Sequence, residues 1–308
     1  MKVNLEDLDL SVLLVNDPGE GVTASDEAIK REIVKQLIYK RADFISTGVK
    51  LVGMETFDNL DIKYTFPSDA AIQYPVPEGS GADLTKVLWA EFAFSLAKAE
   101  GRFFITDEAQ IRGTDRVQWQ TGIRRLGEAM AERKDRNILS TLYSGAGGTR
   151  ACTAPWSTAT AAQITGDVAA IVNTLLSAHG ATDADLKNIA IVVPIAAWSG
   201  LLRILTVEGS NVQLLNWLQG SYNISIMPTK SSLNAFGAAT RGLALITGPD
   251  TAVHGTLRAP ADIPLVETKR QEGVGTEYIV RQFFATTMVP EESGVQTTNR
   301  CMTLTNVA

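Results

Sequence analysis

The side chains best suited to chemistry are few in this chain, and they lie far apart. There are two histidines, His179 and His254, and two cysteines, Cys152 and Cys301. A zinc site needs three or four ligands of histidine, cysteine or carboxylate type at close spacing, and neither histidine has such neighbours. A serine or cysteine nucleophile also needs a base within reach. The sequence therefore predicts no metal site, and it predicts that both cysteines are free thiols.

Three other patterns suggest catalysis or phosphate binding but fail on spacing or context. The glycine cluster at 144–149 (SGAGGT) lacks the lysine of a phosphate loop and follows a helix, so it predicts a helix end and a flexible joint. Ser199 does not lie in a Gly-x-Ser-x-Gly turn. Asp107 and Glu108 are adjacent, but Asp107 with Gln110 fits a helix-capping pair better. We expect no catalytic and no cofactor-binding residues. A carboxylate pair that meets only in space stays open, so a hydrolytic enzyme is the least favoured alternative.

Composition indicates a globular protein that does not recognise nucleic acid by sequence. The 308 residues are 45% hydrophobic and 20% charged, with a net charge of -6. No run approaches the ~18 consecutive apolar residues that span a bilayer. Residues 1–30 carry seven acidic side chains against two lysines. Such a segment repels phosphate, because nucleic-acid affinity depends on cations that displace condensed counterions.

The strongest element in the sequence is a long helix expected over residues 114–143. At 1.5 Å per residue it would measure about 40–45 Å, against ~11–12 residues for an average globular helix. Trp119, Ile123, Leu126 and Met130 recur at helical spacing and are expected to form its buried face. We call this element the spine helix.

An extended hairpin is expected before it. Residues 61–66 (DIKYTF) alternate polar and apolar side chains, as a half-exposed strand does. Residues 69–74 are expected to return antiparallel to them, with Pro67 and Ser68 at the tip, where proline costs no ladder hydrogen bond. A two-stranded ribbon is marginally stable alone, so we expect this one to lie on another surface.

The second half of the chain predicts a sheet covered on both faces, because short apolar strands alternate there with helices. The helices expected there are 164–179 and 195–205, and the expected strands are 188–194, 224–228, 242–247 and 251–257. A further helix is expected at 26–45, before the hairpin. Three further strands are expected at 264–269, 278–288 and 300–307, the last returning to the spine helix.

Four motifs, in this order, resemble the major capsid proteins of tailed double-stranded DNA viruses, the Hong Kong 97-type shell fold that encapsulins share. Each motif is loose, and their order is the specific part. The motifs are residues 97–110 (AKAEGRFFITDEAQ), residues 126–142 (LGEAMAERKDRNILSTL), Val192-Val193-Pro194 followed by Trp198 and Leu201-Leu202, and residues 242–245 (GLAL).

The resemblance implies an α+β fold of the Hong Kong 97 type with four parts. These are an N-terminal arm and helix (1–47), an extended β-hairpin loop (48–91), a peripheral domain with the spine helix (92–157 and 259–308), and a central α/β axial domain (158–258). The extended loop would lie across a neighbouring subunit, since a heterologous contact repeated by rotation closes rings. Its expected contact residues are Ile62, Tyr64, Phe66, Pro67, Ile72 and Tyr74.

The function implied is that of a structural protein that assembles with itself into the hexamers and pentamers of an icosahedral virion shell. The shell would enclose double-stranded DNA non-specifically, and portal, scaffold or decoration proteins would be further partners. The resemblance implies assembly in the host cytoplasm, without a membrane or a cofactor. The alternative is the shell of an encapsulin-like nanocompartment.

Overall fold

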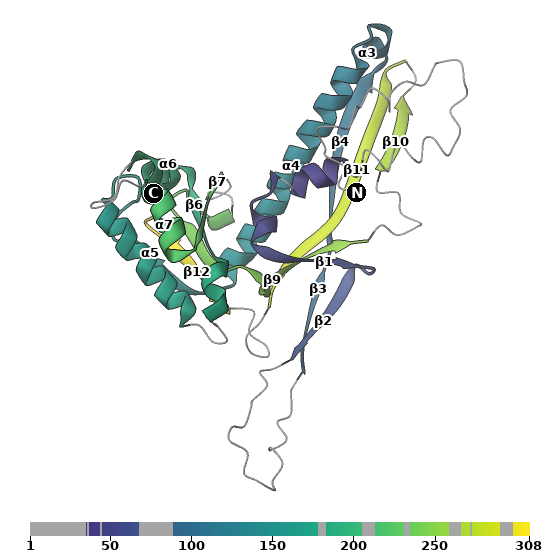
Figure 1. Cartoon of the computed structure of the whole chain (residues 1–308). Coiled ribbons are helices and arrows are strands. Elements are labelled where there is room, and N and C mark those ends of the chain that lie inside the picture. Colours follow the sequence, from purple (N-terminus) through teal and green to yellow (C-terminus); the bar gives the residue numbers. More distant parts are fainter. Residues whose placement is uncertain are drawn as a thin grey trace. The chain divides into compact units, whose positions relative to one another are not determined.

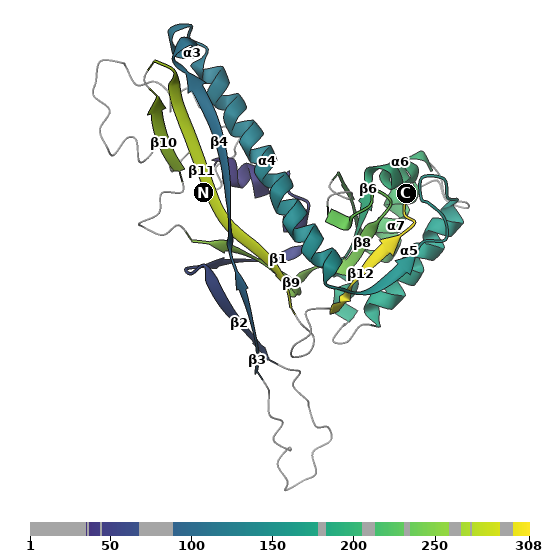
Figure 2. The same ribbon diagram turned by 180° about the vertical axis from the view of Figure 1, so that it is seen from behind.

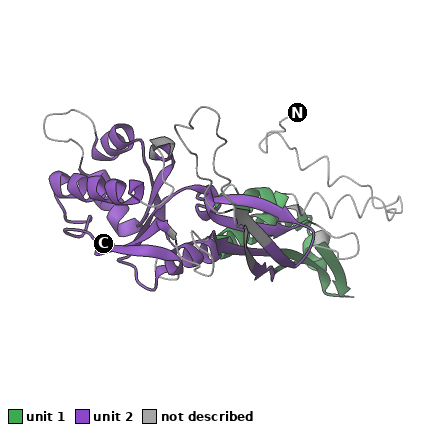
Figure 3. Cartoon of the chain, turned by 90° about the horizontal axis from the view of Figure 1, so that it is seen from below, with its two compact units in different colours: residues 1–46, 98–134, 258–283 green, residues 47–97, 135–257, 284–308 purple. Residues whose placement is uncertain are grey.

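The chain forms two compact units, coloured separately in Figure 3. Unit 1 comprises residues 1–46, 98–134 and 258–283, and unit 2 comprises residues 47–97, 135–257 and 284–308. The computed structural model describes residues 35, 37–43, 45–67, 89–177, 183–204, 213–230, 235–258, 266–271, 273–289 and 298–308. The four-part division expected from the sequence stays a prediction.

Unit 2 is built on a five-stranded mixed sheet in the order β5-β12-β8-β6-β7. Its strands are β5 (Ala146–Ala151), β6 (Ile189–Pro194), β7 (Ser225–Thr229), β8 (Gly242–Ile246) and β12 (Thr298–Thr305). Helices of this unit include α5 (Ala161–Leu176), α6 (Ile195–Arg203), α7 (Leu214–Tyr222) and the 3₁₀ helix η2 (Asp183–Asn188). The strands expected at 188–194, 224–228 and 242–247 are confirmed, whereas α7 was not anticipated.

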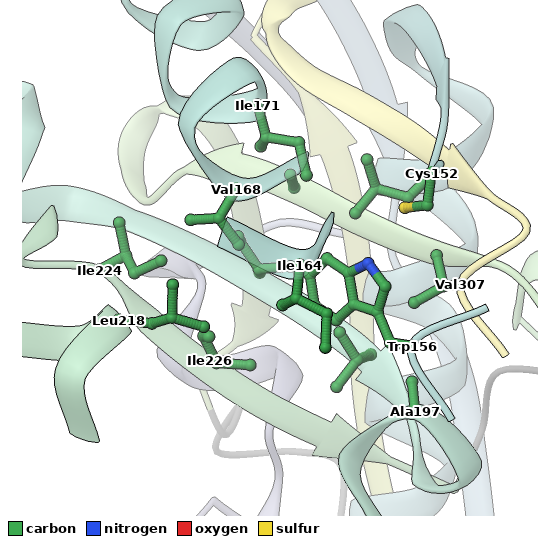
Figure 4. Close-up of a cluster of buried hydrophobic side chains, with 14 of the residues drawn as sticks. Cys152, Trp156, Ile164, Val168, Ile171, Ala197, Leu218, Ile224, Ile226 and Val307 are labelled. Atoms are coloured by element: carbon green, nitrogen blue, oxygen red, sulfur yellow. The ribbon is translucent and has the colours of Figure 1, made fainter. Parts of the chain in front are cut away.

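Both faces of this sheet are covered, as the apolar strands predict. Every residue of β6 is buried, and alternate residues enter different cores. Ile189, Ile191 and Val193 pack with α5, α6 and α7 in one hydrophobic cluster, part of which is drawn in Figure 4. Ala190 and Val192 pack in a second cluster that contains residues from the last turns of the long helix.

One prediction about this unit is wrong. The glycine cluster at 144–149 is not a flexible joint, because residues 146–151 form strand β5. It pairs in parallel with β12, and the Thr149 and Thr303 hydroxyls lie 2.8 Å apart across the pair. Strand β12 therefore lies between β5 and β8. The Cys301 thiol on β12 donates a hydrogen bond to the Leu142 carbonyl of the spine helix. Small side chains suit an exposed edge strand, which sequence periodicity does not reveal.

The spine helix is confirmed as α4 (Asp115–Ser144), which spans 30 residues. The other elements of unit 1 include part or all of β4 (Ala97–Thr106), α3 (Asp107–Ile111), β10 (Val266–Gln271) and β11 (Gly275–Met288). Strand β11 pairs with β10 and with β4, and Figures 1 and 2 show β4 alongside α4. Residues 37–43 are helical and pack on the same core.

The remaining strands of unit 2 carry a separate ribbon. Strand β1 (Val52–Phe57) follows the short 3₁₀ helix η1 (Gly48–Lys50) and pairs in parallel with β9 (Gly248–Leu257), which also pairs with the last residues of β11. Strands β2 (Asp61–Pro67) and β3 (Trp89–Ser95) form a two-stranded sheet of their own. In both views they run side by side (Figures 1 and 2).

The pairing of this ribbon corrects the expected hairpin. Strand β2 pairs with β3 from Asp61 opposite Ser95 to Pro67 opposite Trp89. Pro67 is therefore a paired strand residue and not the tip of a tight turn. The segment 69–74, which we expected as the partner strand, lies outside the described residues. Strand β3 (WAEFAFS) is mostly apolar and lacks the polar–apolar alternation of β2, so the sequence pattern did not mark it as the partner.

Among the helices that the structure describes, none is long and apolar enough to cross a membrane.

Candidate assembly surfaces

The residues singled out for chemistry have structural partners instead. Asp107 pairs with Arg270, and Glu108 is 79% exposed beside Arg112, one helical turn away. The two carboxylates therefore do not converge on a common point. In the described part of the chain no three histidine, cysteine or acidic side chains group as metal ligands. His179 lies outside that part.

The two thiols and His254 are buried as well, and His254 is hydrogen-bonded. Burial, reinforced by the nearby Asp167 carboxylate, raises the pKa of Cys152 to about 12, and burial raises the pKa of Cys301. Both cysteines are free and stay protonated at neutral pH, so they are poor nucleophiles. The His254 Nδ1 lies 2.8 Å from the Thr286 hydroxyl, which in turn donates to the side-chain carbonyl of Asn137.

The ribbon is anchored firmly at its root. The Leu96 amide donates to the Leu60 carbonyl over 2.8 Å, and the Ser95 hydroxyl donates to the Asp61 carboxylate over 2.6 Å. Phe94 meets Phe57 edge to face, with ring centroids 5.8 Å apart. Both rings lie on Gly255 of β9, where a Cβ atom would come within 2.8 Å of Phe57. The ribbon is therefore fixed at its base to β9 of the same unit.

The structure places the expected contact residues of the ribbon unequally. Ile62 is only 6% exposed, so it already packs within its own chain and offers little surface to a neighbour. Tyr64, Phe66 and Pro67 lie on β2, opposite Phe92, Ala90 and Trp89, in the part that extends beyond the root. Ile72 and Tyr74 lie outside the described residues. Phe57, Phe94 and Gly255, which fix the root, were not anticipated, because only tertiary contact brings them together.

The four residues expected on the buried face of the spine helix all contact the core of unit 1. Leu126 and Met130 are 8% and 4% exposed and belong to the cluster, while Trp119 and Ile123 pack against it. Trp119 joins an aromatic group with Phe103 and Tyr278, whose rings stack at 4.9 Å. Lys134, fully buried on the same helix, pairs with Asp43 of the N-terminal helical segment.

An ion network holds the strands of unit 1 together. Arg281 on β11 donates to Glu100 on β4 over 2.9 Å and to Glu267 on β10 over 2.8 Å. Arg102 and Lys98 also form ion pairs with Glu100. Hydrogen bonds from Arg281, then from Arg102, lower the pKa of Glu100 to about 2. The guanidinium group of Arg281 thus links β11 to both of its neighbouring strands, β4 and β10.

Large apolar side chains also lie exposed at the surface of each unit. Among the described residues of unit 1 they are Ile45, Phe104, Ile111, Val117 and Val274, and in unit 2 they include Ile195 and Leu202 on α6. Surface apolar groups that gather in patches mark interaction sites. A signal for Phe104 was present in the sequence. Because successive strand residues face opposite ways, the pair Phe103-Phe104 must turn one ring outward.

The protein thus combines a long helix beside long strands, a separate anchored ribbon and an α/β unit in whose described residues no reactive groups converge. The model of the phage capsid protein family matches residues 90–298, which is more than half of the chain. The chain belongs to this family, and it is a structural shell protein of a phage capsid. A search of curated protein sequences finds no match.

Solved structures show the same fold at low identity. The virus-like particle from Pyrococcus furiosus aligns with a TM-score of 0.59 at 10% identity, covering 90% of this chain and 99% of that one. The capsid of the cyanophage P-SCSP1u aligns at 0.57 and 11% identity over 96% and 93%. The capsid of the Myoviridae phage XM1 aligns at 0.55 and 12% identity over 83% and 90%. The Hong Kong 97-type shell fold expected from the sequence is confirmed.

Proposed function

We propose that this chain assembles with itself into hexamers and pentamers of an icosahedral phage shell that encloses double-stranded DNA. Membership of the phage capsid family supports this proposal, and the isolated ribbon carries it. Two strands that pair only with each other are marginally stable in water. Beyond its root, this ribbon has no third strand among the described residues, and it gains burial by lying across a neighbouring subunit.

The proposal assigns the contact to the far part of the ribbon. Tyr64, Phe66 and Pro67 on β2, with Ile72 and Tyr74 beyond it, meet the neighbour, whereas the buried Ile62 stabilises the root. Ring closure follows when one such heterologous contact is repeated around an axis. The four parts expected from the sequence would then act as arm, extended loop, peripheral domain and axial domain.

We also propose that the protein has no enzymatic activity. Asp107 and Glu108 are bound in separate ion pairs, and the two thiols are buried. These observations favour a structural role. Assembly in the host cytoplasm, and portal, scaffold or decoration proteins as partners, belong to the proposal as well.

A nanocompartment shell of the encapsulin type is the second candidate. The likeness to the Pyrococcus furiosus virus-like particle, which covers nearly all of that chain, favours it. The contents of purified particles separate the two: packaged double-stranded DNA supports the phage shell, and a protein cargo without DNA supports the compartment.

The register of the ribbon shows how to test the assembly role. Lys63 stands opposite Ala93, so residues 64–92 can be replaced by an Asn-Gly turn that closes the shortened hairpin. This variant keeps Phe94, Asp61 and the Gly255 contact. We expect it to fold, with an unchanged circular dichroism spectrum, but to form no closed particles in negative-stain microscopy. Intact shells from this variant would refute the assembly role of the ribbon.

A further inference from the structure

Unit 1 carries a groove between β4 and the first half of α4, with a volume of about 550 Å³. The two elements run antiparallel along it. Three contacts fix their register: Gly101 against Leu126, Phe103 against Gly122, and the Thr106 amide to the side-chain carbonyl of Gln118 over 3.3 Å. Later residues of β4 therefore lie beside earlier residues of α4, and this register decides which side chains share each end of the groove.

One end of the groove is apolar. Phe104 of β4 lies at this end, where Val117 lines the groove from the start of α4. Val117 is 62% exposed and Phe104 is 37% exposed, so both present apolar surface to solvent. Between the two walls a Cβ at Gly122 would come within 2.6 Å of the Phe103 ring. Position 122 has no side chain, which leaves that ring room to lie against the helix.

The other end of the groove carries positive charge. Arg125 lies about two helical turns after Val117, and by the register Arg102 of β4 lies at the same end. Among the lining residues that the structure describes, none is acidic. Arg102 already forms ion pairs with acids of β4 and β11. Arg125 is exposed, and the next acid along the helix, Glu128, pairs with Arg41 instead. Arg125 is therefore the cation best placed to meet a ligand.

A ligand that matches both ends combines an anionic head with an apolar tail. Val117, Thr121 and Arg125 recur every four residues and all line the groove, so they form a row along one face of α4. From Val117 to Arg125 this row measures about 12 Å, at 1.5 Å per residue. An extended alkyl chain of roughly ten carbons, with bonds of about 1.5 Å, covers this distance. The volume also lies within the ~300–1,000 Å³ that is usual for small-molecule pockets.

We infer that the groove between β4 and α4 binds a free single-chain carboxylate amphiphile, of the fatty-acid type. Its carboxylate accepts hydrogen bonds from the planar guanidinium of Arg125, whose geometry matches it. Its chain lies along Val117 and Phe104, where each methylene that leaves water contributes to binding. The inference concerns unit 1 of one copy, so it stands independently of the assembly proposed above.

Isothermal titration calorimetry of the full-length chain tests this inference, with decanoate below its micelle concentration as the probe. Decyltrimethylammonium has the same chain with a positive head, and acetate has the head without the chain. We expect one decanoate to bind per chain, with an affinity at least about tenfold above that of decyltrimethylammonium, because only the carboxylate pairs with Arg125. Acetate should show no measurable binding.

Two exposed positions in the groove have matched controls outside it. Arg125→Gln should weaken decanoate binding about tenfold through loss of the charge-assisted hydrogen bonds, whereas Arg124→Gln, at the exposed neighbour that does not line the groove, should leave it unchanged. Val117→Ser should weaken binding severalfold, whereas Val274→Ser, at a side chain that is 52% exposed outside the groove, should not. Circular dichroism checks that each variant is folded.

Several results would overturn the inference. They are no binding of decanoate by the folded chain, equal affinity for the two amphiphiles, many decanoate molecules bound per chain, and equal effects of the Arg125 and Arg124 variants. Vesicles of anionic phospholipid offer a lipid headgroup as the other source of negative charge. Binding to vesicles without binding of free decanoate would assign Arg125 to a membrane surface, and it would overturn the inference as well.

Discussion

Asp167 on α5 is the buried charge whose removal should destabilise unit 2 most clearly. Its carboxylate is 3% exposed and accepts hydrogen bonds from the Thr153 amide, from the Thr153 hydroxyl and from Trp156 Nε1. These bonds tie the segment after β5 to the helix. The perturbation we consider is Asp167→Ala.

The size of the effect follows from which donors can turn to water. Thr153 is exposed, so its amide and hydroxyl recover hydrogen bonds to solvent. Trp156 is completely buried, so its Nε1–H stays unpaired, at a cost of ~1–3 kcal/mol. With the lost bonds to a charged acceptor, each ~1.5–3 kcal/mol before that recovery, we expect a total loss of about 3–4 kcal/mol.

Equilibrium urea unfolding of the unassembled chain at neutral pH measures this loss, with circular dichroism as the probe because Trp156 itself contributes to fluorescence. Asp250→Ala is the control, since that side chain is 82% exposed in the same unit, and it should change the free energy of unfolding by less than ~0.5 kcal/mol. In a double-mutant cycle with Trp156→Phe we expect a coupling energy of about 1–2 kcal/mol. If Asp167→Ala were as stable as the control variant, the reasoning about the orphaned indole would be wrong.

Three further predictions concern the core of unit 1, its ion network and the ribbon root. Leu126→Asp places an unpaired charge in the core and should cost roughly 3–5 kcal/mol, whereas Ala129→Asp on the exposed side of the same helix should be close to neutral; normal urea stability of the Leu126 variant would show that the buried face is misplaced. Because the Glu100 pKa falls from 4.5 to about 2 on folding, the stabilisation from the ionised carboxylate is present above pH 4.5 and is lost as the pH falls toward 2. The urea midpoint of the wild type should therefore decline over this pH range, and Glu100→Gln should flatten the decline. Parallel curves for the two proteins would contradict this assignment. Gly255→Val places a side chain against Phe57 and Phe94, and it should lower the free energy of unfolding by about 1–3 kcal/mol and impair particle formation. The control Gly148→Ala on β5, where a Cβ meets only Met302 at 4.0 Å, should assemble normally. Normal particles from both variants would show that assembly does not require a fixed root.

Elements with a strong local signal were predictable from the sequence. The spine helix was placed within a residue at each end, because its apolar spacing persists over many turns and glycines follow it. The all-apolar strand at 189–194 was equally clear, since a continuous apolar run between helices requires cover on both faces.

Features that depend on partners distant in the chain were not predictable. Strand β5 has no apolar pattern and exists because β12, about 150 residues later, pairs with it. The partner of β2 was misassigned because β3 lacks the polar–apolar alternation of β2, and its place is fixed by tertiary contacts such as Phe94 on Gly255.

The position of β12 has a consequence for the order of events during synthesis. Residues 298–305 fill the place between β5 and β8, so the sheet of unit 2 stays split while the ribosome is still translating the residues before them. Until that strand emerges, both neighbouring strands present open edges, and a chaperone has a defined interval in which to protect them. Because this interior strand is made late, the five-stranded sheet of each copy can be completed only after residue 305 has been translated.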